Sequence, residues 1–308
     1  MIELDDIRII GARLKREILL HLDELRKGAP LGKGAGGDVT FPIDKRAEDI
    51  IIEEVERRGK PVTIVSEECG LKHINGGGPR LLIDPIDGSR NALSGVSLFS
   101  TSIALVDGDT IESTVIGYVL NIISGDEFWA VRDHGSFLNG TLITTQAEDS
   151  CKVIAYEAQS PGRDIVRIIP LISLFNRARC FGSTALDMAF LAQGAVSMLV
   201  IPSPSRSFDF AAGYLLVKEA GGIVSDLEGR GLDSIEVSVK RATPVLASAN
   251  RELHYKALKI LSRRTTDFIP ARHKKQKKYP CPDCIFCQWC SDTRCRRCRP
   301  PVIDRTTK

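Results

Sequence analysis

The sequence lacks the features that mark membrane proteins, secreted proteins and histidine-based metal sites. No apolar run approaches the ~20 residues that a membrane-spanning helix requires. The amino-terminal segment lacks the basic start and the apolar centre of a signal peptide. The five histidines, at positions 21, 73, 134, 254 and 273, show no metal-ligand spacing. We therefore expect a cytoplasmic protein with no membrane partner.

Cysteine is scarce over most of the chain. Only Cys69, Cys151 and Cys180 occur outside residues 281–298, and none of the three begins a Cys-x5-Arg loop of the kind found in cysteine phosphatases. No internal repeat is evident. The 308 residues are 43% hydrophobic, which is enough for one large core or two fused ones.

Residues 81–91, LLIDPIDGSRN, form the most informative segment. Asp84 and Asp87 end a strand that is too apolar to be an exposed edge, and two like charges there are costly unless a hard divalent cation neutralises them. Pro85 fixes one backbone dihedral between them. Gly88 and Ser89 then begin a helix, where free N–H groups favour an anion. The alternative is an ordinary turn in which Asp87 caps a helix.

Further acids follow other glycine-rich or apolar segments. Residues 61–70, PVTIVSEECG, form a short strand that ends in Glu67 and Glu68, although a solvated loop would explain that pair too. Asp209 lies in an apolar stretch that leads into a helix, where it could be a simple N-cap. Asp44 lies on the first turn of a helix after Gly-Asp-Val-Thr. Four such places together favour a metal centre over four separate explanations.

Five motifs in this order resemble those of the inositol monophosphatase superfamily, and most of all its archaeal members. They are GDVTFPIDKRAEDI, Glu67-Glu68, DPIDGSRN, GSTALDMAFLAQGAVSMLV and FDFAAGYLLVKEAGGIVSD. The resemblance covers nearly the whole chain except its end. Archaeal members are often dual enzymes that act on fructose 1,6-bisphosphate and inositol 1-phosphate.

The resemblance implies an α/β phosphatase fold layered α-β-α-β-α, dependence on two or three Mg²⁺ ions, and a homodimer. Its implied first-metal ligands are Glu67, Asp84 and the carbonyl of Ile86, with Asp84 bridging to the second metal. The implied second-metal ligands are Asp87 and Asp209, and a third ion would lie near Glu68 and Asp44. Gly88 and Ser89 would bind the phosphate through backbone N–H groups. The family usually has Thr where this chain has Ser89, and Ser89 keeps the hydroxyl that helps to orient the attacking water.

The expected chemistry is attack of metal-activated water on a phosphate monoester. Such an ester carries two negative charges that repel hydroxide, so positive charge must gather at the phosphoryl group. Arg179, Ser183 and Arg206 lie close to motifs and are candidate substrate ligands. Arg163 and Arg167 are better explained as a solvated helix face.

Three functions remain open on this basis. The first is a Mg²⁺-dependent phosphatase for a sugar or inositol phosphate. The second is a nucleotidase of the same superfamily that acts on 3′(2′),5′-bisphosphates. The third is a degenerate phosphatase body that only carries the carboxyl-terminal tail. The retained acids argue against the third, because a scaffold has no need for charged ligands at strand ends.

The expected order of elements is two helices, a strand, a loop and a second strand, followed by an antiparallel stretch through residues 97–132. Alternating strands and helices then continue to about residue 263. The first helix is amphipathic, with apolar residues at positions 4, 7, 10, 14, 18, 22 and 25. The predicted domains are a phosphatase domain at 1–263, a basic linker at 264–280 and a Cys-rich tail at 281–308.

The tail differs from the body in charge and in cysteine content. From residue 271 on, 11 Lys and Arg face three Asp, a net charge of +8, while the rest of the chain carries 31 basic and 36 acidic residues, a net charge of −5. Six cysteines fall within residues 281–298. In a reducing compartment this density points to metal rather than to disulfides.

Cys281, Cys284, Cys295 and Cys298 make two Cys-x2-Cys knuckles that suit tetrahedral Zn²⁺. A shifted set, Cys284, Cys287, Cys295 and Cys298, competes with it; iron–sulfur ligation and free thiols are further alternatives. The segment is too small to fold without its metal. Its basic residues and aromatic side chains suit nucleic acid, and a protein partner or a plain stabilising appendage are the alternatives.

Overall fold

The computed structural model describes residues 2–262 of the chain. The predicted tail ligands Cys281, Cys284, Cys295 and Cys298, the predicted linker and the domain boundary at residue 263 lie outside these residues or at their edge and stay predictions. Within the described part of the chain, no helix is long and apolar enough to cross a membrane.

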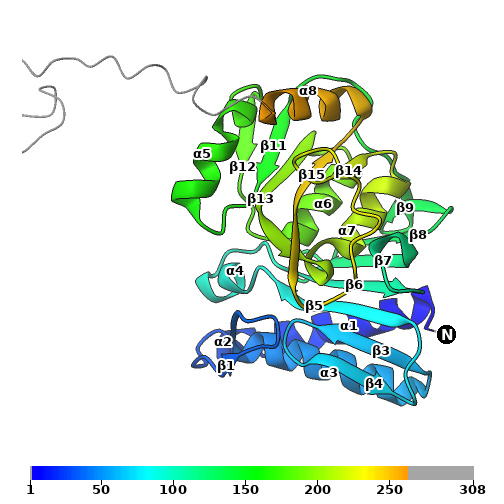
Figure 1. Cartoon of the computed structure of the whole chain (residues 1–308). Coiled ribbons are helices and arrows are strands. Elements are labelled where there is room, and N and C mark those ends of the chain that lie inside the picture. The colour runs from blue at the N-terminus through cyan, green and yellow to red at the C-terminus, as the bar shows by residue number, and fades with distance from the viewer. Residues whose placement is uncertain (1, 263–308) are drawn as a thin grey trace, which may run out of the picture. The chain divides into compact units, whose positions relative to one another are not determined.

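Two β-sheets form the frame of the structure (Figure 1). The larger has the order β10-β9-β8-β7-β6-β5-β3-β4, and the smaller has the order β12-β11-β13-β15-β14. The strands of the larger sheet are β3 (Val62–Ser66), β4 (Gly70–Ile74), β5 (Arg80–Asp87), β6 (Ser100–Val106), β7 (Thr114–Asn121), β8 (Glu127–Val131), β9 (Gly135–Leu138) and β10 (Thr141–Ile143). Those of the smaller sheet are β11 (Val153–Tyr156), β12 (Arg177–Arg179), β13 (Met198–Arg206), β14 (Ile223–Ser225) and β15 (Arg241–Ser248). A separate hairpin pairs β1 (Gly32–Lys33) with β2 (Val39–Thr40).

Helices cover both faces of each sheet. They are α1 (Leu4–Leu20), α2 (Leu22–Leu25), α3 (Pro42–Arg58), α4 (Ser89–Ser94), α5 (Pro161–Ile172), α6 (Thr184–Ala192), α7 (Ser207–Glu219) and α8 (Arg251–Leu261), with a 3-10 turn η1 at Ile111–Ser113. Figure 1 shows α1 and α3 beneath the larger sheet, α6 and α7 between the two sheets, and α5 and α8 outside the smaller one. The predicted α-β-α-β-α layering agrees with this arrangement.

Alternating side chains of the strands explain the layers, because successive residues of a strand point to opposite faces. On β5, Leu81 and Ile83 pack with α1 and α3, whereas Leu82 packs with α6 and α7. On β13, Leu199 faces the middle layer and Val200 faces the outer layer of α5 and α8. Both sheets are therefore apolar on both faces.

The predicted order of elements is correct in outline, but it lacks the β1–β2 hairpin, has a loop where the structure has β4, and differs in two further places. The amino-terminal helix ends at Leu20 and is followed by the single turn of α2, although its apolar positions Ile7, Ile10, Leu14 and Ile18 are buried as expected. The antiparallel stretch continues past residue 132, because the turns before β9 and β10 extend the same sheet instead of leading into a helix.

Candidate active site

A β-bulge places Asp84 and Asp87 where they can face one site. In the pairing of β5 with β6, Asp84 lies opposite Ser102 and Asp87 opposite Ser100, so β5 has one extra residue between the two acids. Residues three apart in a regular strand point to opposite faces, and the extra residue of a bulge cancels that alternation. Pro85 lies within the bulge, where a missing N–H costs no ladder hydrogen bond.

Glu67 and Glu68 directly follow β3, the neighbour of β5. The two strands run parallel, with Ser66 opposite Ile83, so their carboxyl ends meet at the same edge of the sheet. The Glu67 N–H donates to the Ile83 carbonyl at 3.3 Å, which brings Glu67 next to Asp84. The sequence pattern of an apolar strand followed by an acid is thus repeated on two adjacent strands.

Asp209 enters from α7, in the layer between the sheets. Its carboxylate accepts a hydrogen bond from the Arg206 N–H at 2.7 Å, which closes the first turn of the helix. The interpretation of Asp209 as the N-cap is wrong, because Arg206 holds that position and Asp209 is the third residue of the helix. The helix N-terminus still favours a carboxylate there.

Asp44, from the first turn of α3, contacts the segment that begins α4. The Ser89 hydroxyl lies 2.6 Å from the Asp44 carboxylate and 2.9 Å from the Ile86 carbonyl. One hydroxyl proton serves only one of these acceptors at a time. Gly88 precedes Ser89 with φ of 93°, and a side chain there would lie 2.9 Å from the Gly182 carbonyl, so the turn requires glycine.

Burial raises the pKa of every acid in this cluster. It raises the pKa of Asp44 and of Asp209 to about 6 each and that of Glu68 to about 7. Burial, together with the nearby charges of Asp209 and Glu68, also raises the pKa of Glu67. For Asp84, burial and then the charges of Glu67 and Asp87 raise the pKa well above its ordinary range.

The donor set fits a hard divalent cation. The Oδ1 atom of Asp84 is buried and accepts no hydrogen bond from the described residues, so a charged carboxylate there lacks a neutralising partner among them. Mg²⁺ prefers carboxylate and carbonyl oxygens, and the cluster supplies both from Asp84 and the neighbouring acids and from Ile86. Between residues 2 and 262, no three acidic, histidine or cysteine side chains already converge at ligand spacing.

Helix α6 holds Asp87 from the opposite side. The Asp87 carboxylate accepts hydrogen bonds from the Ser183 hydroxyl at 2.7 Å and from the Ala185 N–H at 2.6 Å. Burial raises the pKa of Asp87 to about 7, against the effect of these donors. Ser183, predicted as a substrate ligand, is therefore a buried helix cap that positions an acid.

The two candidate arginines have different surroundings. Arg179 lies on the edge strand β12 and is exposed, and within residues 2–262 its side chain donates only to the Ala178 carbonyl, at 2.9 Å. Arg206 is buried, and its guanidinium contacts Gly36, Asp38 and Glu67. Arg179 is thus open to a ligand, whereas Arg206 is occupied by protein partners.

The motifs did not identify Glu157, whereas Asp187 lies within the motif GSTALDMAFLAQGAVSMLV. Glu157 follows the apolar strand β11 and accepts a hydrogen bond from the Gly182 N–H at 2.9 Å. Asp187 is fully buried on α6, and both its oxygens lack a donor within the described part of the chain. Burial raises the pKa of both acids, and the nearby charge of Glu157 raises that of Asp187 further. The signal that identified Glu67, an acid after an apolar strand, was present at Glu157 as well.

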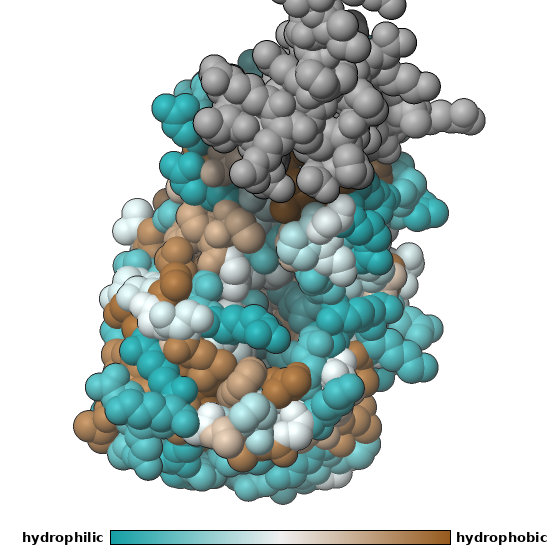
Figure 2. Space-filling view, turned by 90° about the vertical axis from the view of Figure 1, so that its left-hand side faces the viewer, coloured by the Kyte–Doolittle hydropathy of each residue, from teal (hydrophilic) through white to brown (hydrophobic). Residues whose placement is uncertain are grey.

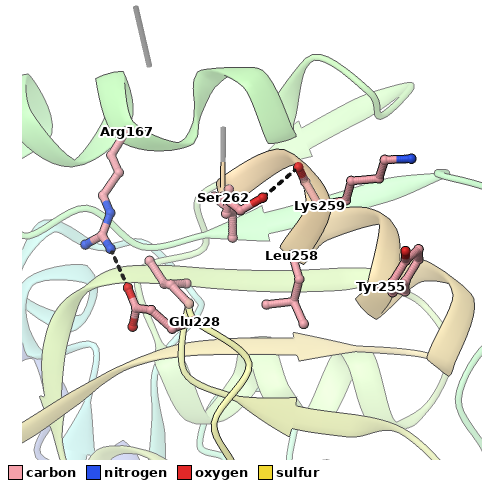
Figure 3. A pocket seen from close by; sticks show the side chains of 8 residues that line it. Arg167, Glu228, Tyr255, Leu258, Lys259 and Ser262 are labelled. Atoms are coloured by element: carbon pink, nitrogen blue, oxygen red, sulfur yellow. Dashed lines mark hydrogen bonds and ion pairs between the residues drawn. The ribbon is translucent and has the colours of Figure 1, made fainter. Parts of the chain in front are cut away.

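Figure 2 shows the side of the molecule on which α2 and α4 lie in Figure 1, with a hydrophilic hollow near the middle of that face. A different surface groove of about 580 Å³ lies between α5 and α8. Arg167 and Glu228 form a 3.5 Å ion pair on one side of it, and Tyr255 and Leu258 line the other (Figure 3). None of the clustered acids lines this groove, so it is separate from the candidate site.

Comparison with known proteins agrees with the geometry. The profile of the inositol monophosphatase family matches residues 7–265. The fructose-1,6-bisphosphatase/inositol-1-monophosphatase of Methanothermobacter thermautotrophicus is 33% identical over 245 residues, which cover 76% of this chain and 87% of that protein. The bifunctional NADP phosphatase/NAD kinase of Methanococcus maripaludis is 31% identical over 253 residues, 75% of this chain but 44% of that protein.

Solved structures share the fold. The extragenic suppressor protein suhB of Bartonella henselae aligns with a TM-score of 0.73 and 27% identity, covering 84% of this chain and 98% of that one. Members of the matched family typically use Mg²⁺. The chain belongs to the inositol monophosphatase family and is a phosphoric monoester hydrolase of the fructose-1,6-bisphosphatase/inositol-1-monophosphatase type.

Proposed function

We propose that this enzyme hydrolyses fructose 1,6-bisphosphate, inositol 1-phosphate or both, with Mg²⁺ held by the acid cluster. The observation that carries the proposal is the Asp84 carboxylate, which is buried among other acids and has one oxygen without a hydrogen-bond partner among residues 2–262. A buried group of this kind is stable only when protonated or bound to a cation. When bound, two or three Mg²⁺ ions would supply positive charge at the phosphoryl group and lower the pKa of a water.

Most of the proposed ligands for the first two ions lie at the carboxyl ends of β3 and β5. Glu67, Asp84 and the Ile86 carbonyl would hold the first ion, and Asp84, Asp87 and Asp209 the second. Glu68 and Asp44 would hold a third. The Ser183 hydroxyl and the Ala185 N–H support this set by fixing the orientation of Asp87.

Ser89 is the proposed link between the acids and the attacking water. When its hydroxyl donates to Asp44, an oxygen lone pair remains to accept a hydrogen bond from that water. The backbone N–H groups of Gly88 and Ser89, at the start of α4, are the proposed phosphate contacts. Arg179 is the proposed contact for the rest of the substrate because it is exposed and free of carboxylate partners among the described residues. Arg206 stays a second candidate only if its present partners release it.

The test measures phosphate release from fructose 1,6-bisphosphate, inositol 1-phosphate and adenosine 3′,5′-bisphosphate, with Mg²⁺ and after EDTA. Metal-dependent turnover of the first two is the expected result. The Asp84→Asn variant serves as the matched control for contaminating phosphatase. If the purified enzyme releases no more phosphate than that variant from any substrate, the proposal fails.

A nucleotide phosphatase is the second candidate, favoured by the similarity to an NADP phosphatase/NAD kinase. NADP⁺ therefore belongs in the same substrate panel. Faster turnover of NADP⁺ or of adenosine 3′,5′-bisphosphate than of the sugar phosphates would favour this candidate. The expected homodimer stays a prediction, which light scattering in solution would test.

A further inference from the structure

Arg206 places a fixed positive charge inside the acid cluster. The residue is 4% exposed, and its Nη1 atom lies 3.5 Å from the Glu67 carboxylate. Its backbone N–H holds Asp209 at 2.7 Å. A buried guanidinium so close to Glu67 supplies part of the neutralisation that a divalent cation would otherwise supply.

The same guanidinium is shared with an acid outside the cluster. Nη2 of Arg206 donates to the Asp38 carboxylate at 2.7 Å, a shorter contact than the 3.5 Å to Glu67. Asp38 also accepts from Arg241 at 3.1 Å, and Arg241 is itself held by Gln159 at 2.7 Å. Asp38 therefore draws Arg206 toward the solvent side and away from Glu67.

The β1–β2 hairpin carries Asp38 to this position. Its tip binds the backbone beside the acids, because the Gly36 N–H donates to the Glu67 carbonyl at 2.7 Å and the Ala35 N–H to the Glu68 carbonyl at 3.0 Å. A side chain at position 36 would lie 3.2 Å from the Glu67 side chain and 3.4 Å from the Arg206 guanidinium. Glycine therefore allows the hairpin, Glu67 and Arg206 to lie together.

We propose that Asp38 and Arg206 set the divalent-cation affinity of the acid cluster: Arg206 competes with the cation for Glu67, and Asp38 holds Arg206 away. This inference rests on the proposed cation site at Glu67 and Asp84. Both are positioning residues, since neither needs to contact the cation or the substrate. Removing Asp38 leaves Arg206 to pair with Glu67, and removing the charge of Arg206 frees Glu67 for the cation.

The test is direct Mn²⁺ binding to the whole enzyme without substrate, followed through the electron paramagnetic resonance signal of free Mn²⁺. We expect Asp38→Asn to raise the Kd for Mn²⁺ about fivefold and Arg206→Gln to lower it about tenfold. The effect of Arg206 should be larger because its charge is closer to the acid cluster and more buried than that of Asp38. In the double variant, Asp38→Asn should have no further effect, because its partner is gone. Asp23→Asn, which removes an exposed charge 93% open to solvent, should leave the Kd unchanged.

Arg206→Lys keeps the positive charge and is the charge-conserving control. Thermal unfolding of each variant checks separately that it is folded. A folded Arg206→Gln variant with unchanged or weaker Mn²⁺ binding overturns the inference, as does an additive double variant. The proposed cation site itself would be overturned by a different result, namely that the wild-type enzyme binds no more Mn²⁺ than the Asp84→Asn variant does.

Discussion

Two groups of buried and half-buried carboxylates in this molecule have opposite surroundings. Between α1 and α3, Glu54 accepts hydrogen bonds from Arg13 at 2.9 Å and from Arg58 at 2.7 Å, and Asp6 accepts one from Lys60 at 2.7 Å. Burial acts to raise the pKa of Glu54, yet the hydrogen bonds from Arg58 and Arg13 outweigh it and the pKa is lowered. At the carboxyl ends of β3 and β5, the acids face one another and their pKa values are raised.

The difference separates a structural group of charges from a functional one. Each carboxylate between α1 and α3 has a cation of the chain as its partner, so it stabilises the packing of the two helices. In the acid cluster, one arginine serves several carboxylates, and the remaining charge requires a ligand from solution. Unpaired buried charge lowers the stability of the fold, and its retention marks a site of chemistry.

Replacing Asp84 by Asn should show the largest effect. We expect phosphate release to fall about a thousandfold, because the charge that a bound metal supplies to the transition state amounts to several kcal/mol and each ~1.4 kcal/mol is tenfold in rate. The unfolding temperature in EDTA should rise, since a repelling charge is removed. Asp6→Asn is the matched control and should reverse the pattern, with normal activity and a lower unfolding temperature. Wild-type activity in Asp84→Asn would contradict the assignment.

Stability in EDTA should fall as pH rises. Asp44, Asp209 and Glu68 have folded-state pKa values of about 6 to 7, above their ordinary 3.8 to 4.5. The unfolded chain therefore releases protons first, so stability is greatest below about pH 4 for these groups and is lost up to about pH 7. The loss is ~1.4 kcal/mol per pH unit of displacement for the buried Asp44 and Asp209, and less for the partly exposed Glu68 because solvent screens its charge. Added Mg²⁺ should remove most of this loss. Thermal unfolding from pH 5 to pH 8 measures the pH dependence of stability in EDTA and in Mg²⁺. If the unfolding temperature falls with pH equally in the two solutions, the result would count against the cation site.

Ser89→Ala should reduce turnover by about 10- to 100-fold, as expected for loss of a group that orients a reacting water. Ser89→Thr keeps the hydroxyl and should retain activity. The KM should change less than kcat in Ser89→Ala, since the phosphate contacts are backbone N–H groups. An alanine variant with normal kcat would remove Ser89 from the mechanism.

Glu54→Gln should affect stability alone. The side chain is 5% exposed, and losing its charge weakens contacts with Arg13 and Arg58, which we expect to cost about 1–3 kcal/mol of unfolding free energy. Denaturant titration measures the loss, with Glu56→Gln on the exposed face as the control. Reduced kcat in a folded Glu54→Gln variant would show that the two groups of charges are not independent.

Deleting residues 265–308 should have the smallest effect on catalysis. The acids and their supporting residues all lie before residue 263, so kcat and KM on the preferred substrate should be unchanged. If the tail binds nucleic acid, salt-sensitive binding to RNA or DNA should disappear in the deletion, and zinc content should fall by the amount bound in the full chain. Loss of phosphatase activity would assign the tail a part in the active site.

Sequence patterns were sufficient to propose the fold class and the acids. Glu67, Asp84 and Asp87 follow apolar strands, and Asp209 lies in an apolar stretch that leads into a helix. A carboxylate in such a place is costly without a function. The chemistry of these residues is local, so it can be interpreted from a few neighbours along the chain. The order of the five motifs then favoured one family over isolated coincidences.

Only the tertiary structure decided which side chains face the same site and which groups they pair with. The bulge that turns Asp84 and Asp87 to one side depends on β6, whose Ser102 and Ser100 lie opposite them and set the register. The hydrogen bond from the Gly182 N–H to Glu157 joins segments that are apart in sequence, and so does the division of Arg206 between Asp38 and Glu67. Residue type and spacing determine which charges the chain carries, whereas hydrogen-bond partners depend on distances of a few Å that only packing sets.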